Sequence, residues 1–330
     1  MILELKDISV RFTAKSQVQA VEDVSLSIED RSKVAIVGET GSGKSILLLA
    51  ILCLLPEDAR VSGQVLFEGR DLLRLTRPEL DQLRGSEISY IPQGSGNAMN
   101  PLYSVGFQVA EPMMEHKGLE KKTAFVKAVE LLKKFKLGDE ERIAKQYPHT
   151  YSGGMRQRAL IAMGIGAGAR MLLADEPTKG LDEERVDLVV DSFRMLADKT
   201  ILCVTHDLNF AQRISDHICV MYAASQVEYG PTQEMLGAPL HPYTRDMVMA
   251  MPEHGLHASQ GFAVSHEDYG TMGCKYAPRC SDCFEKCNQV PPVVAVGDRL
   301  VRCWKYVQEP AEEGKEKGEG VRESADRGSD

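Results

Sequence analysis

The chain has 330 residues, 43% of them hydrophobic and 26% charged, which is the composition of a soluble globular protein of about two or three domains. Acidic residues outnumber basic ones 48 to 39, and the net charge of -9 excludes a broad basic surface for nucleic acid. The longest apolar run, residues 46–55, is far shorter than the ~20 residues that cross a bilayer, so we expect any membrane role to depend on a partner.

The sequence also indicates in which kind of cellular compartment the protein is found. Residues 1–4 carry no basic region or cleavage site, so no export signal is expected. Eight cysteines without such a signal are typical of a reducing compartment. Five of them fall between Cys274 and Cys303, and this clustering favours a metal site over a disulfide framework.

The N-terminal region alternates apolar and polar residues in short, β-rich segments, namely 2–10, 18–28 and 34–37. They predict an antiparallel sheet that leads into a nucleotide-binding core. Directly after the third segment the chain reads Gly38-Glu39-Thr40-Gly41-Ser42-Gly43-Lys44-Ser45, followed by Ile46 and an apolar helix predicted over 46–55.

This strand, glycine-rich loop and helix fit the phosphate-binding P-loop. Glycines let consecutive backbone N–H groups turn around a phosphate chain at a helix N-terminus. Lys44 would reach the β- and γ-phosphates, and the Ser45 hydroxyl would bind Mg²⁺. The alternative is a Gly/Ser-rich turn with a chance lysine.

The predicted secondary structure changes twice in the middle of the chain. Residues 63–67 and 88–91 predict two further strands, and from 101 to about 158 the pattern becomes helical, with a clear helix at 123–135. Strands at 171–174, 200–205 and 217–222 then alternate with helices at 183–197 and 208–214. This alternation predicts a parallel α/β sheet with an inserted helical subdomain.

Polar side chains follow two of these strands. Asp175 and Glu176 end the strand 171–174, where a Mg²⁺ ligand and a base for an attacking water belong beside a P-loop. The alternative is a buried strand with a polar exit. His206 follows the strand 200–205, although a histidine there is more often a packing or capping residue.

The region beyond Pro252 is rich in loops and cysteines up to about residue 307. Four thiols lie within thirty residues there, namely Cys274, Cys280, Cys287 and Cys303. Because this segment has too few apolar residues to build its own core, the thiols predict a metal that organises the fold. Unliganded buried cysteines are an alternative, whereas Cys53, Cys203 and Cys219 lie in apolar runs and are predicted to be core. The polar tail, 309–330, is predicted to be disordered.

A second anion site is predicted at residues 151–158, where Ser152, Gly153 and Gly154 open a helix. This segment resembles the Leu-Ser-Gly-Gly-Gln signature of ATP-binding cassette (ABC) ATPases, with Tyr151 in place of Leu and Met155 in place of Gln. Neither substitution removes a backbone donor.

Other positions match motifs of the same family in order. Phe12 corresponds to the aromatic residue that stacks on adenine, Gln93 to the Q-loop glutamine, Asp182 to the D-loop aspartate and His206 to the switch histidine. The resemblance covers residues 1–250 and implies an α/β, P-loop ABC-type nucleotide-binding domain with an antiparallel β subdomain, a parallel core and a helical subdomain at about 100–160.

The family likeness also implies roles. Glu176, His206, Lys44 and Gln93 would act in catalysis, and Ser45, Gln93 and Asp175 would bind Mg²⁺. ATP would contact Phe12, residues 38–46 and, in a partner chain, Ser152, Gly153, Gly154 and Asp182.

Two further segments, 96–101 and 241–245, resemble the oligopeptide, dipeptide and nickel branch of ABC importers. In that branch the ATPase lies on the cytoplasmic face of the membrane and pairs with a second, related ATPase. The pair drives two permeases that are fed by an extracytoplasmic substrate-binding protein, and no nucleic acid is involved. The motifs do not distinguish peptide from nickel or metal-chelate import.

The cysteine spacing resembles that of peptide-importer ATPases whose C-terminal domain carries a four-iron four-sulfur cluster. The likeness favours iron–sulfur at a Cys-rich module, 251–308, over zinc, which would use paired C-x-x-C motifs where only Cys280 and Cys283 form one. Rival functions are a soluble ABC ATPase acting on nucleic acid or ribosomes, and a non-hydrolysing regulatory cassette. Tandem cassettes or basic surfaces would indicate the first, and the intact Lys44 and Glu176 argue against the second.

Overall fold

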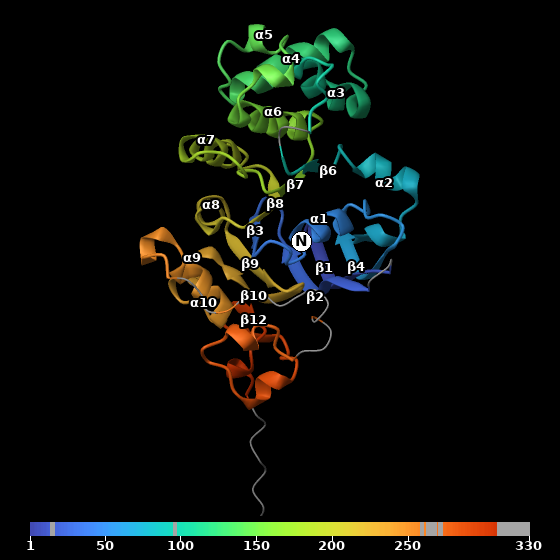
Figure 1. Cartoon of the computed structure of the whole chain (residues 1–330). Coiled ribbons are helices and arrows are strands. Elements are labelled where there is room, and N and C mark those ends of the chain that lie inside the picture. The colour runs from blue at the N-terminus through green and yellow to red at the C-terminus, as the bar shows by residue number, and fades with distance from the viewer. Residues whose placement is uncertain (14–16, 95–97, 258–260, 262–268, 270–272, 309–330) are drawn as a thin grey trace, which may run out of the picture.

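The computed structural model describes residues 1–13, 17–94, 98–257, 261, 269 and 273–308. The tail predicted to be disordered, 309–330, lies outside these residues, as do Gly96 and Asn97 of the branch motif. A single mixed sheet runs through the molecule in the order β5-β4-β1-β2-β10-β9-β3-β8-β7-β6 (Figure 1).

The N-terminal part of this sheet is antiparallel, as predicted for residues 2–10 and 18–28, whereas the third predicted segment, 34–37, pairs only with parallel neighbours. β1 (Leu3–Phe12) pairs with β2 (Val18–Ile28) and with β4 (Ala59–Phe67), which also pairs with β5 (Arg70–Asp71). The inward side chains of these strands form one buried cluster with α1 (Lys44–Ile51). The strand predicted at 63–67 begins earlier, and the helix predicted over 46–55 begins at Lys44 and ends at Ile51.

The other part of the sheet contains a parallel core, which was also predicted. The parallel strands are β6 (Ile88–Ile91), β7 (Met171–Asp175), β8 (Thr200–Thr205), β3 (Lys33–Val37) and β9 (His217–Tyr222). β7 and β8 are buried along their whole length, which explains their continuous apolar sequence. α7 (Glu183–Arg194) and α8 (Leu208–Ile214) connect the strands; α7 ends three residues before the predicted end of its helix.

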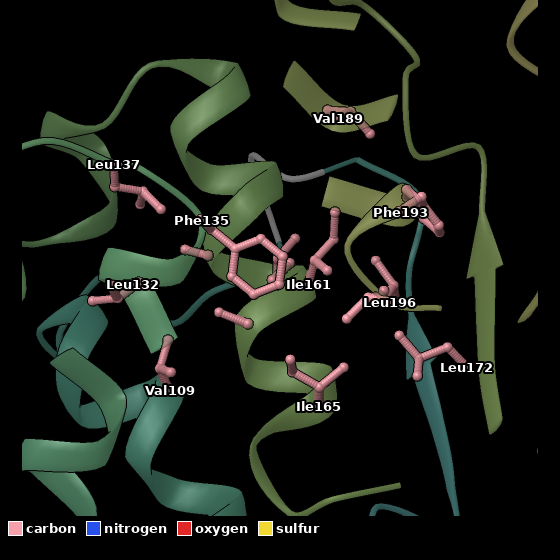
Figure 2. Close-up of a cluster of buried hydrophobic side chains, with 14 of the residues drawn as sticks. Val109, Leu132, Phe135, Leu137, Ile161, Ile165, Leu172, Val189, Phe193 and Leu196 are labelled. Carbon is pink, nitrogen blue, oxygen red and sulfur yellow. The ribbon is translucent and has the colours of Figure 1, made fainter. Parts of the chain in front are cut away.

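A helical group stands at the far end of the sheet from the C-terminal region (Figure 1). It consists of α3 (Val105–Lys117), α4 (Lys121–Lys134), α5 (Glu140–Ile143) and α6 (Gly153–Gly166). Figure 2 shows Leu132, Phe135 and Ile161 of this group in the same cluster as Leu172 and Phe193. Burying each such side chain contributes about 1.5–3 kcal/mol, so the cluster fixes the helical group against β7 and α7. Across the described ranges, no helix has the length and apolar character needed to cross a membrane.

Several elements were not predicted from the sequence. They include β5, α2 (Arg77–Leu83), β10 (Ser225–Pro231), α9 (Thr232–Gly237), α10 (Pro242–Met249), β11 (Val294–Val296) and β12 (Arg299–Val301). β12 pairs with β10, so the C-terminal segment, defined here as residues 273–308, adds to the same sheet. Tyr276 of this segment is buried in a cluster with residues of β9, β10 and α10. The segment therefore shares the core of the preceding chain, and a separate Cys-rich module is not confirmed.

Candidate nucleotide site

The P-loop connects the end of β3 to the start of α1. Gly43 has φ of 96°, and a Cβ on it would lie 2.1 Å from the Ala20 carbonyl oxygen. A Cβ on Gly38 would lie 2.1 Å from the carbonyl oxygen of Met221. Any larger residue at either position would collide with a neighbouring strand, so the two glycines allow the loop to pass close to the sheet.

Lys44 is buried, and its ammonium group is held by the loop itself. Nζ donates hydrogen bonds to the carbonyl oxygens of Gly38 at 2.7 Å and Glu39 at 2.9 Å. Burial lowers the pKa of Lys44, while the nearby Glu176 and Asp175 carboxylates act in the opposite direction. A cationic donor in this position can exchange its carbonyl partners for phosphate oxygens.

Asp175 lies where two hydroxyl groups converge. Its Oδ1 accepts a hydrogen bond from Ser45 Oγ at 2.8 Å, and its Oδ2 accepts one from the Tyr90 hydroxyl at 3.3 Å. Burial raises the pKa of Asp175, and the two hydrogen bonds oppose that rise. Carboxylate and hydroxyl oxygens are ligands that Mg²⁺ prefers, so Ser45 and Asp175 fit a magnesium ion; sequence reasoning did not identify Tyr90.

Glu176 and His206 form a pair at the ends of β7 and β8. His206 Nδ1 lies 2.7 Å from Glu176 Oε2, and the Glu176 side chain is 9% exposed. Glu176 has φ of 47°, a left-handed conformation that costs about 1–3 kcal/mol for a residue other than glycine and is found most often at functional sites. The pair can orient a water molecule and accept its proton.

A cleft of about 440 Å³ opens over the P-loop, a volume that falls in the range of small-molecule sites. Ten of the residues predicted for the nucleotide site line it: Phe12, Thr40, Gly41, Gly43, Lys44, Ser45, Ile46, Gln93, Glu176 and His206. Lys179 also lines the cleft and was not predicted; its position directly after the Asp175–Glu176 strand end is the signal that could have identified it. Four other predicted residues do not line the cleft, namely Gly38, Glu39, Ser42 and Asp175.

The second predicted anion site lies elsewhere. Ser152 Oγ accepts a hydrogen bond from the Met155 backbone N–H at 3.3 Å and begins α6, and Asp182 accepts one from Arg185 at 3.1 Å and begins α7. A Cβ on Gly153 would lie 3.2 Å from the Leu181 side chain, so the two helix starts are neighbours. None of Ser152, Gly153, Gly154 and Asp182 lines the cleft.

The two departures from the signature sequence have a structural explanation. Tyr151 is 3% exposed, and its hydroxyl donates a hydrogen bond to the Ile143 carbonyl oxygen at 2.9 Å. Burial raises the pKa of Tyr151, which keeps the hydroxyl protonated as a donor. Met155 packs against the same core. Both side chains therefore contact the helical group and leave the backbone donors of Gly153 and Gly154 in place.

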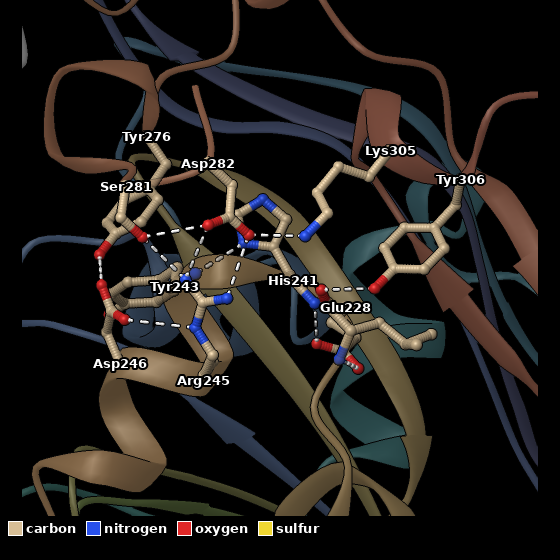
Figure 3. Close-up of polar contacts among 11 residues, drawn as sticks. Glu228, His241, Tyr243, Arg245, Asp246, Tyr276, Ser281, Asp282, Lys305 and Tyr306 are labelled. Carbon is tan, nitrogen blue, oxygen red and sulfur yellow. Dashed lines mark hydrogen bonds and ion pairs between the residues drawn. The ribbon is translucent and has the colours of Figure 1, made fainter. Parts of the chain in front are cut away.

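The motif 241–245 contacts both the P-loop and the C-terminal segment. Figure 3 shows its contacts with the C-terminal segment, including that of Arg245 with Asp282. His241 is buried, begins α10 by accepting a hydrogen bond from the Tyr243 N–H, and has its pKa lowered to about 3 by burial, so it is neutral near pH 7. The Tyr243 hydroxyl accepts a hydrogen bond from the Glu39 N–H at 3.0 Å. Arg245 forms an ion pair with Asp282 at 3.0 Å.

The predicted metal site at the cysteines is not supported. Among the residues with described positions, no group of three or more His, Cys, Asp or Glu side chains is placed to hold a metal ion. The four thiols do lie within electrostatic reach of one another: burial raises the pKa of Cys274 to about 11, and Cys287, Cys303 and Cys280 add to the rise. Cys203 and Cys219 are buried in the core, as predicted, whereas Cys53 is only partly buried and packs against the core cluster.

Comparisons with known proteins agree with this geometry. Residues 21–179 match the "ABC transporter" family model, and residues 227–287 match "Oligopeptide/dipeptide transporter, C-terminal region". The chain is 35% identical to the oligopeptide transport ATP-binding protein OppD of Salmonella typhimurium, covering 94% of this chain and 95% of that protein. It is 36% identical to AppD of Bacillus subtilis, an oligopeptide transport ATP-binding protein, covering 94% and 99%. A dimeric structure of the ATP-binding cassette MJ0796 bound to ADP and Pi matches with a TM-score of 0.63 and 26% identity, covering 70% of this chain and 98% of that one.

Proposed function

Because this chain belongs to the family of ABC transporter ATP-binding proteins that includes the oligopeptide transport subunits, we propose that it hydrolyses ATP to drive the import of di- and oligopeptides. The main support for ATPase activity is the cleft over the P-loop, which is lined by Lys44, Glu176 and His206. The match of residues 227–287 to the C-terminal region of oligopeptide and dipeptide transporters favours peptides as cargo.

The site residues take the following roles in this proposal. Phe12 stacks on the adenine ring, and the P-loop N–H groups of residues 38–46 bind the phosphate chain. Lys44 exchanges its carbonyl partners for β- and γ-phosphate oxygens. Ser45, Asp175 and Gln93 would hold Mg²⁺, which neutralises charge on the phosphates when bound.

In ATP hydrolysis the protein does little covalent chemistry, so its main task is to position the attacking water molecule. Glu176 accepts the proton of the attacking water, and its 2.7 Å contact with His206 fixes the carboxylate. The His206 side chain is 54% exposed, so it can also reach the γ-phosphate from the solvent side of the cleft. Electrostatic stabilisation by Lys44 and His206 then lowers the barrier.

The second anion site belongs to a composite arrangement. Ser152, Gly153, Gly154 and Asp182 lie away from the cleft of their own chain, which fits closure over a nucleotide bound to a partner chain. In this proposal residues 1–250 form the ATPase domain, with the helical subdomain at about 100–160, and the partner is a second, related ATPase. The pair lies on the cytoplasmic face of the membrane, where the Gln93 loop and helical subdomain contact two permeases served by a substrate-binding protein.

Hydrolysis by the isolated chain tests the composite site. We expect slow turnover, because each nucleotide needs the Ser152–Gly154 backbone donors of another subunit, and we expect turnover to rise when the related ATPase and the permeases are added. ATP hydrolysis is measured by phosphate release at fixed chain concentration. Full activity of a homodimer without permeases would contradict the proposal, and co-purification with permeases of a nickel or metal-chelate importer would favour the alternative cargo.

We also propose that Cys274, Cys280, Cys287 and Cys303 bind a four-iron four-sulfur cluster. Support comes from the spacing of the four cysteines, which resembles that of peptide-importer ATPases with such a cluster, since four thiolates are its usual ligands. The residues 251–308 would form the region that carries it, and zinc is the alternative metal.

Metal content tests this part of the proposal. Protein purified without oxygen is expected to be brown and to contain about four irons per chain, and Cys280→Ser is expected to lose both iron and colour. Cys283→Ser is the matched control and should keep them. Colourless protein with one zinc per chain would move the site to zinc, and metal-free protein would leave these residues as ordinary core cysteines.

A further inference from the structure

Glu39 places a negatively charged side chain in the P-loop. It is the second residue of a loop whose backbone N–H groups face a chain of phosphates, and a carboxylate there would repel the nucleotide. The structure turns this side chain away from the cleft toward Arg279 of the C-terminal segment. Arg279 Nη1 lies 2.9 Å from Glu39 Oε1 and 3.1 Å from Oε2.

Arg279 is held firmly in this position. Its side chain is 6% exposed, and its guanidinium lies 5.7 Å from the Tyr222 ring centroid and 5.5 Å from that of Tyr276. These two rings also pack on Tyr243, with centroids 4.6 and 5.3 Å from it, respectively. A planar cation between aromatic rings is oriented before it meets its carboxylate partner.

The same cluster reaches the P-loop backbone. The Glu39 N–H donates to the Tyr243 hydroxyl at 3.0 Å, and the Glu39 carbonyl accepts from Lys44 Nζ at 2.9 Å. Glu39 is thus fixed by α10 through its N–H, by the C-terminal segment through its side chain, and by Lys44 through its carbonyl. A shift of Arg279 would therefore move the loop that binds phosphate or leave the Glu39 charge without its arginine partner.

We propose that Arg279 is a positioning residue of the ATP site, which neutralises Glu39 and holds it out of the cleft, so that docking of the C-terminal segment sets the affinity of the P-loop for ATP. The inference rests on the proposed ATP binding at the P-loop but not on the transported cargo. By thermodynamic reciprocity, ATP in turn stabilises the docked state of residues 273–308.

Four variants of the full chain test this inference by equilibrium binding of Mg-ATP. Arg279→Gln leaves Glu39 charged and unpaired, and we expect the Kd to rise about tenfold, which corresponds to about 1.4 kcal/mol. Glu39→Gln keeps the backbone N–H but removes the carboxylate charge that the Arg279 cation balances, so the Kd should fall by about twofold. The double variant should regain most of the affinity that Arg279→Gln loses, because the repelling charge is absent.

Arg302→Gln is the matched control. Arg302 also lies in the C-terminal segment and has a side chain only 10% exposed. It pairs with Asp23 at 2.7 Å and donates to the Gln226 carbonyl oxygen, and both of these partners lie outside the P-loop. It should leave the Kd within about twofold even if it lowers the melting temperature as much as Arg279→Gln does.

Proteolysis of the wild-type chain and of the two arginine variants tests the reciprocal effect of ATP on the C-terminal segment. ATP should slow cleavage within residues 273–308 of the wild-type chain, and this protection should be weaker in Arg279→Gln than in Arg302→Gln. Equal Kd values for Arg279→Gln and Arg302→Gln, or a double variant no tighter than Arg279→Gln, would overturn the inference. If Arg279→Gln does not fold, a Kd for Glu39→Gln raised tenfold or more would also overturn it. Failure of the wild-type chain to bind ATP would instead reject the proposed function itself.

Discussion

Changing Glu176 to Gln is expected to slow ATP hydrolysis by about two orders of magnitude or more, with ATP affinity retained. Gln has the shape of Glu and can keep the hydrogen bond to His206, but it cannot accept the proton of the attacking water. Because ATP would bind and stay intact, the variant should accumulate as an ATP-bound dimer with its partner. Single-turnover hydrolysis and size-exclusion chromatography with ATP measure the two effects.

The control for this experiment is Glu57→Gln, since Glu57 is exposed and lies outside the cleft. It should hydrolyse ATP at the wild-type rate. Near-normal turnover by Glu176→Gln in the assembled complex would remove Glu176 from the role of base.

Changing Lys44 to Ala is expected to weaken ATP binding itself. A hydrogen bond to a charged group contributes about 1.5–3 kcal/mol, so the loss corresponds to a Kd raised roughly tenfold or more. Lys44 also bonds to the carbonyl oxygens of Gly38 and Glu39, and its removal takes away contacts that shape the loop. Equilibrium binding of a fluorescent ATP analogue measures the change.

Lys127→Ala serves as the matched control, because Lys127 is exposed on α4 and does not line the cleft. An unchanged Kd is expected for it. If Lys44→Ala also bound ATP as tightly as the wild type, the loop over residues 38–45 would not be the phosphate site.

The parts of the site that could be predicted are those encoded by local sequence. Gly38 to Ser45 form a contiguous loop, and Asp175, Glu176 and His206 each follow an apolar run that could only be a buried strand. Because carboxyl ends of neighbouring parallel strands meet at one edge of a sheet, their convergence could be expected before the structure was known. Their catalytic roles remain predictions.

The features that escaped prediction depend on long-range contacts. The turn between β9 and β10 uses Ala223 and Ala224, both with positive φ, where glycine or asparagine would have signalled a hairpin. Without β10, its pairing with β12 could not be anticipated. The Glu39–Arg279 pair joins positions 240 residues apart, so no local pattern reports it.

The cysteines show a different limit. Their spacing predicts a metal, yet spacing does not give the directions of the thiols, and the described side chains do not form a metal site. The C-terminal segment is also held by contacts that the sequence did not reveal, including Arg245 with Asp282 and Arg302 with Asp23.

If this ATPase powers peptide import, the rate of ATP hydrolysis in the reconstituted complex should depend on peptide. The chain, its related ATPase and both permeases are placed in vesicles, and phosphate release is measured with the substrate-binding protein, with and without peptide. We expect slow hydrolysis without peptide and a several-fold rise with peptide-loaded binding protein, and no such rise in Glu176→Gln. A rate that does not respond to peptide but rises with nickel or a metal chelate, or one that needs no permease, would contradict this function.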